Sequence, residues 1–111
     1  SSAASDVYKR QMKEQADVLA SIGREKQKNY LAYCQRLVRE NFIYRFQAPE
    51  LNYMNREEAA FAVKFSPYVN ERNVIDLMDE LAKAELHISQ NVNPKMVFFD
   101  LALRITVLIR R

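Results

Sequence analysis

The feature that most constrains this chain is the spacing of its apolar residues, which recur at intervals of three and four along most of its length. In the segment 24–46 the residues at these intervals are Leu31, Cys34, Val38 and Phe42. An α-helix gathers residues with this spacing on one face. No stretch bounded by turns alternates apolar and polar residues, as a strand would. The pattern therefore predicts an all-α protein.

Proline, glycine and asparagine mark the expected ends of the helices. Gly23 can end a first helix, and Pro49 indicates a loop over residues 47–54. Asn55 and Asn70 are candidate N-caps, and Pro67 disfavours helical geometry in Ser66, at the end of the helix that follows Asn55. The last helix has the clearest start, where Asn93 can cap and Pro94 fits the first helical position. The expected helices cover residues 12–22, 24–46, 55–65, 70–90 and the segment from 94 onward.

The length of 111 residues suits one domain with one modest core. We therefore expect residues 12–111 to form a single five-helix bundle. Residues 1–11 resemble translated adaptor sequence from assembled metagenomic reads and are interpreted as a non-native or disordered segment. Native sequence is expected to begin near Met12, as part of a longer protein.

The composition argues against a catalytic, cofactor or metal site. A phosphate-binding loop needs several glycines, and Gly23 is the only one. The single cysteine, Cys34, excludes a disulfide framework and a thiolate zinc cluster; it suits a reducing cytoplasm, and we expect it to be buried. His87 is the only histidine and has no grouped ligands in the sequence, so we expect a surface or packing role. We predict no enzyme activity, no cofactor and no small-molecule substrate for this chain.

The apolar run from Val97 to Ile109 is too short for a membrane span, which needs about 20 residues, and Asp100 and Arg104 interrupt it. Its apolar face is so broad that the helix should be covered on most sides. No contact with a membrane is expected, and the run is interpreted as a buried helix.

The net charge of +3 is slight for a nucleic-acid binder of this size, and the basic residues are mixed with acidic ones. The polar face of the segment 24–46 is interpreted as solvated surface or as a partner site.

Aromatic residues could stack on single-stranded bases if a basic surface displayed them, but their helical spacing favours core packing. They include Tyr30, Tyr33, Phe42, Tyr44, Phe61 and Phe65.

Four separated blocks, in this order, are similar to the C-terminal region of bacterial DNA polymerase III delta-prime subunits, which belong to the clamp-loader family. The first two are Arg24-Glu-Lys-Gln-Lys28 and Arg39-Glu-Asn-Phe42. The others are Phe65-Ser-Pro67 and the segment 91–101, Asn-Val-Asn-Pro-Lys-Met-Val-Phe-Phe-Asp-Leu. The resemblance covers roughly residues 12–111, and no block is a catalytic signature.

The resemblance implies a helical collar domain in a pentameric clamp loader of the cytoplasm. In that family an N-terminal AAA+ module precedes the collar domain, and motor subunits use ATP hydrolysis to load the sliding clamp onto primed DNA during DNA replication. The implied partners are delta-type and gamma/tau-type subunits, with the sliding clamp and primed DNA reached only through the full complex. For each residue that is a candidate for subunit contact, the alternative role is helix capping or a solvated surface position. The candidates are Arg24, Lys28, Arg39, Asn91, Asn93 and Lys95.

Two other functions stay open at this point. A helical nucleic-acid-binding module would place basic residues of the segment 24–46 on phosphates, with steep salt dependence. A homo-oligomeric helical scaffold would associate with itself and ignore clamp-loader subunits.

Overall fold

The computed structural model describes residue 10, residues 13–45 and residues 68–111. Residues 13–20 are helical, α2 spans Arg24–Arg45, α4 spans Val74–Ser89 and α5 spans Pro94–Leu108. No strand occurs in these described ranges. The all-α prediction is therefore confirmed for them, whereas the loop expected at 47–54 and the helix expected at 55–65 lie outside the described residues.

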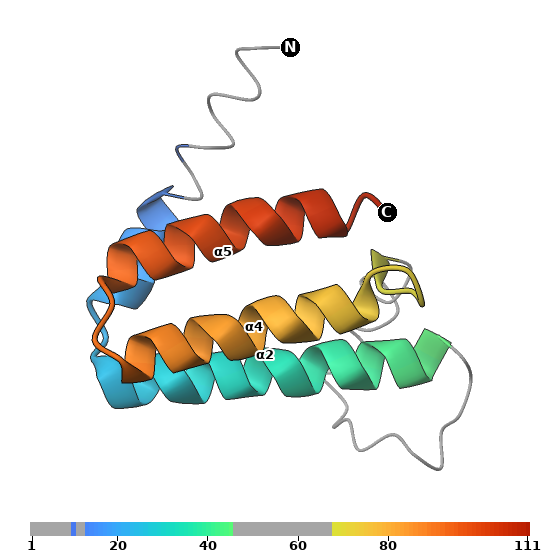
Figure 1. Ribbon diagram of the computed structural model, residues 1–111, viewed down its shortest axis with the longest axis horizontal. Coiled ribbons are helices and arrows are strands. Elements are labelled where there is room, and N and C mark those ends of the chain that lie inside the picture. The colour runs from blue at the N-terminus through green and yellow to red at the C-terminus, as the bar shows by residue number, and fades with distance from the viewer. Residues whose placement is uncertain (1–9, 11–12, 46–67) are drawn as a thin grey trace.

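The three long helices run side by side, and α4 packs against both α2 and α5 (Figure 1). The helix at residues 13–20 lies at the end of the bundle where α2 begins and α4 connects to α5 (Figure 1). Each helix directs its apolar stripe toward the space that the others enclose, as the periodicity predicts. Buried apolar side chains of the core include Leu31, Val38, Leu77, Leu81, Ile88, Val97, Phe98, Leu101 and Leu108.

The turn between the first helix and α2 depends on Gly23 and on a buried glutamine. Gly23 has a φ of 94°, a conformation that glycine adopts at low cost. The Gln27 side chain, 2% exposed, donates from Nε2 to the carbonyls of Leu19 and Ala20, at 3.1 Å each. These bonds satisfy carbonyls that the end of a helix leaves without partners. Gly23 was predicted to end this helix; the burial of Gln27 was not predicted.

The expected N-cap at Asn70 is wrong, because α4 begins at Val74 with Asn73 as its N-cap residue. Asn70 instead holds the preceding turn: its Oδ1 accepts from the backbone N of Arg72 at 2.8 Å. The Asn73 side chain is fully buried and turns back, where its Oδ1 accepts from the backbone N of Asn70 at 2.9 Å. The two asparagines share one turn, so the helix starts after the second of them.

The start of α5 agrees with the prediction. Asn93 is its N-cap, Pro94 is its first residue, and Asn93 Oδ1 accepts from the backbone N of Lys95 at 3.0 Å. At the other end, Asn73 Nδ2 donates to the Leu108 carbonyl at 3.0 Å. The helix is thus fixed at both ends by asparagine side chains.

Candidate assembly surface

The structure brings two of the predicted contact residues together. Arg24, the first residue of α2, donates from Nη2 to Oδ1 of Asn91, in the turn between α4 and α5. Asn91 has a φ of 63°, a left-handed conformation that asparagine tolerates better than most residues. The bond therefore joins α2 to the α4–α5 turn within the chain.

The other four candidates have separate local roles. The Asn93 side chain caps α5 at the backbone of Lys95. Lys28 lies 3.8 Å from Glu25, one turn earlier on α2, and both belong to the outer surface. Arg39 lies 2.9 Å from the carboxylate of Glu40, whose side chain is only 2% exposed. Fifteen residues separate Arg39 from Arg24, about 22 Å along the helix, so the six candidates do not form one site and their role in subunit contact stays a prediction.

Large apolar side chains are exposed along the outward sides of α4 and α5 and in the turn between them. The most exposed are Ile75 at 69%, Met96 at 67% and Val107 at 61%, and Leu86 is about half exposed. Single exposed apolar residues are ordinary, but a set shared by two adjacent helices is typical of a surface that another molecule covers. We call this surface the α4–α5 face; its apolar residues are Ile75, Leu86, Val92, Met96 and Val107.

Most charged groups in the strip between α4 and α5 are paired, several across the two helices. Arg104 Nε on α5 lies 2.8 Å from Asp100 and 3.6 Å from Glu80 of α4. The hydrogen bond that Arg104 donates to Asp100, and then the charges of Asp100 and Glu80, raise the pKa of the Arg104 guanidinium above its usual value. Arg111 lies 2.6 Å from Asp76. These pairs neutralise the strip between the helices and leave the exposed aliphatic side chains as its main feature.

A groove of about 250 Å³ runs between α4 and α5, next to the turn that joins them. His87 lies in its wall with Lys83, near Met96. No group of three or more potential metal ligands occurs among the residues that the structure describes. The groove mixes apolar and charged side chains and holds no catalytic arrangement that we can identify; its lining is Glu80, Lys83, Ala84, His87, Val92, Met96, Val97, Asp100 and Leu101.

A second, more apolar cavity of about 300 Å³ lies where the helix 13–20 meets α2, α4 and α5. Cys34 contributes to its wall and is half-buried rather than fully buried as expected. Burial raises the pKa of its thiol, which therefore stays protonated near neutral pH. The cavity belongs to the core that the four helices share.

The expected core packing of the aromatic residues is wrong for two tyrosines of α2. Tyr30 is 42% exposed and Tyr33 is 44% exposed. Tyr30 keeps one packing contact, an edge-on approach to Phe98 with ring centroids 6.4 Å apart. Arg36 places its guanidinium carbon 5.3 Å from the Tyr33 ring centre. Phe42 packs against the core as predicted, and Tyr44, Phe61 and Phe65 have side chains outside the described part of the chain.

The sequence could have indicated the α2 tyrosines by their angular position. At 100° per residue, Tyr33 lies well away from the stripe of Leu31 and Val38, so helical spacing alone did not place it in the core. The same angular test marks part of the α4–α5 face, because Ile75 and Leu86 lie on the side of α4 opposite to the buried residues Leu77, Leu81 and Ile88.

Comparisons of the chain with protein-family models, curated proteins and solved structures give no match. Among the helices that the structure describes, none combines the length and the hydrophobicity that crossing a membrane requires. What the protein does is therefore inferred from its residues and surfaces.

Proposed function

We propose that this chain is a subunit-assembly domain of the DNA polymerase III clamp loader, of the delta-prime collar type. The resemblance of its four sequence blocks to delta-prime subunits supports this function. In the five-helix bundle proposed here, the helix predicted at 55–65 would supply the remaining element. The domain would act in the cytoplasm and contribute no catalytic residue, while the other subunits supply ATP-dependent clamp loading on primed DNA.

The observation that carries the proposal is the α4–α5 face. Met96, Leu86 and Val107 expose apolar side chains on two adjacent helices whose intervening charges are paired. Protein interfaces combine apolar centres with polar groups that are already satisfied, since unpaired charges at the centre cost desolvation energy. The strip between the two helices meets both conditions, so we assign the contact with a neighbouring subunit to the α4–α5 face.

The test mixes the full 111-residue chain with purified delta-type and gamma/tau-type subunits from the same source. Light scattering after gel filtration should show a discrete mixed complex. The double substitution Leu86→Glu with Met96→Glu should abolish it, because two charges would be buried at the apolar centre. Lys26→Glu, on the exposed outer side of α2, is the control and should leave the complex intact.

Circular dichroism of each variant separates loss of binding from loss of folding. A folded chain that stays monomeric with every subunit would contradict the proposed function. Self-association without the subunits would favour a homo-oligomeric scaffold. A mixed complex that survives the double substitution would contradict the assignment to the α4–α5 face.

A further inference from the structure

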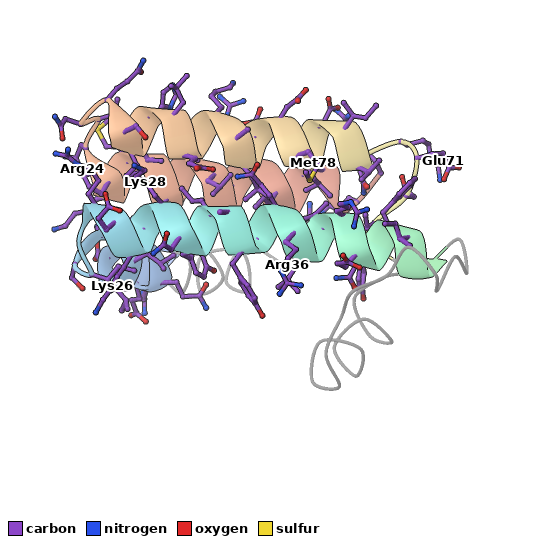
Figure 2. The ribbon with its side chains drawn as sticks, turned by 90° about the horizontal axis from the view of Figure 1, so that it is seen from below. Arg24, Lys26, Lys28, Arg36, Glu71 and Met78 are labelled. Atoms are coloured by element: carbon purple, nitrogen blue, oxygen red, sulfur yellow. The ribbon has the colours of Figure 1, made fainter. Side chains whose placement is uncertain are left out.

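Helix α2 concentrates the positive charge of the molecule. It carries six basic and two acidic residues, a formal net charge of +4, whereas the entire chain has +3. Both acidic residues are paired with basic neighbours, Glu25 with Lys28 and Glu40 with Arg39. Lys26 and Arg36 project from α2 on the side away from α4 (Figure 2). Two of the six basic residues of α2 therefore place positive charge on this side of the helix.

The two exposed tyrosines lie between these cations on the same helix. Tyr30 and Tyr33 are three residues apart, so their side chains are neighbours on the helix surface. Each ring has contacts within the chain: Tyr30 with Phe98 and Cys34, and Tyr33 with the Arg36 guanidinium. Rings held in this way lose little conformational entropy when a flat ligand stacks on them.

Lys26, Tyr30, Tyr33 and Arg36 form a short linear strip along α2. Lys26 precedes Tyr30 by about one turn and Arg36 follows Tyr33 by about one turn, which gives roughly 15 Å from end to end. We call this strip the α2 aromatic face; it consists of Lys26, Tyr30, Tyr33 and Arg36. Aromatic rings flanked by cations match the alternation of bases and phosphates in a single strand.

We propose that the α2 aromatic face binds single-stranded nucleic acid, with bases stacked on the two tyrosine rings and phosphates held by Lys26 and Arg36. A duplex keeps its bases stacked on one another, so it would offer the rings nothing to stack on. Glu14 borders the same shallow groove as Tyr30, and its negative charge would repel a phosphate on that side of the ring. This proposal is independent of clamp-loader assembly, because it depends on a different surface.

The test uses the full chain and a fluorescein-labelled oligothymidylate, with binding followed by fluorescence anisotropy. Tyr33→Ala should weaken binding about 5- to 150-fold, the usual range for loss of one stacked base. Tyr33→Phe keeps the ring and should bind nearly as well as the parent chain. Tyr68→Ala removes a tyrosine that is 52% exposed but lies outside α2, and it should have no effect.

Salt dependence tests the part of the cations. Lys26→Ala should reduce the slope of log affinity against log salt by roughly 0.7, the value for one phosphate contact on a single strand. Lys83→Ala, an exposed lysine on α4, is the matched control and should leave the slope unchanged.

Three outcomes would overturn the proposal. Binding that Tyr33→Ala leaves intact would show that the rings do not stack on bases. Equal affinity for a duplex of the same length would indicate a purely electrostatic contact. Failure to bind the oligonucleotide, together with loss of a subunit complex on Tyr33→Ala, would make the α2 aromatic face a protein interface. Tyr30→Ala is a weaker test, because Tyr30 also packs on Phe98 and its loss could affect folding.

Discussion

The α4–α5 face and the α2 aromatic face both expose large side chains, from 39% to 69% on the first and 42% and 44% on the second, and they differ in chemistry. On the first, aliphatic residues such as Met96 and Val107 surround charges that are already paired. On the second, Tyr30 and Tyr33 lie on a helix with a strong excess of positive charge. The degree of exposure therefore does not identify a partner. The residue types and the balance of charge differ between the faces, and our two proposals, a protein subunit for one face and a single-stranded nucleic acid for the other, are based on that difference.

Both faces depend on the same core, and the largest expected effect is a substitution there. Leu81 of α4 is 2% exposed and borders the cavity shared by α2, α4 and α5. Leu81→Ala should lower the free energy of unfolding by about 2–5 kcal/mol, through lost apolar contacts and the space left behind. Urea denaturation followed by circular dichroism measures this, and both binding activities should weaken together. A change within about 0.5 kcal/mol, typical of surface substitutions, would show that the faces do not share this core.

A smaller effect should separate the two faces. Asn73→Ala leaves the carbonyls of Tyr68 and Leu108 without the donor they share and the backbone N of Asn70 without its acceptor. The free energy of unfolding should fall by about 1–3 kcal/mol, the usual cost of leaving buried polar groups unsatisfied. Because Leu108 ends α5, subunit binding at the α4–α5 face should suffer more than oligonucleotide binding on α2.

Asn29→Ala, an exposed asparagine on α2, is the control for this substitution and should leave stability nearly unchanged. Equal losses of both binding activities in the Asn73 variant would contradict a separate role for the end of α5.

The smallest effect concerns the protonation of Tyr30. Burial, then the negative charge of the Cys34 thiolate and a hydrogen bond with Cys34, raise the pKa of Tyr30 from 10.0 to about 12. Folding therefore favours the neutral phenol, and this contribution to stability is complete below about pH 10 and is lost as the pH rises to about 12. Ultraviolet titration of tyrosinate should show a component near pH 12 that Tyr30→Phe removes and Tyr68→Phe keeps. If Tyr30→Phe left that component unchanged, Tyr30 would not be held against Phe98 and Cys34 as described.

The sequence predicted the helices better than their surfaces. Periodicity and local signals located α2, the turn at Gly23 and the start of α5 at Asn93 and Pro94, because these depend on backbone preferences of nearby residues. The sequence misplaced the start of α4, because the Asn73 side chain donates a hydrogen bond to the carbonyl of Leu108, a residue 35 positions away. It also assigned Tyr30 and Tyr33 to the core, although the angular position of Tyr33 lies well away from the stripe of Leu31 and Val38.

Methyl and aromatic NMR of the full chain tests most directly whether the two faces bind different partners. Addition of the delta-type and gamma/tau-type subunits should shift or broaden the methyl signals of Leu86, Val92, Met96 and Val107 and leave the ring signals of Tyr33 unchanged. Addition of oligothymidylate should do the reverse. If both partners perturb the same set of signals, or if the subunits perturb only the tyrosines of α2, the division of function between the two faces is wrong.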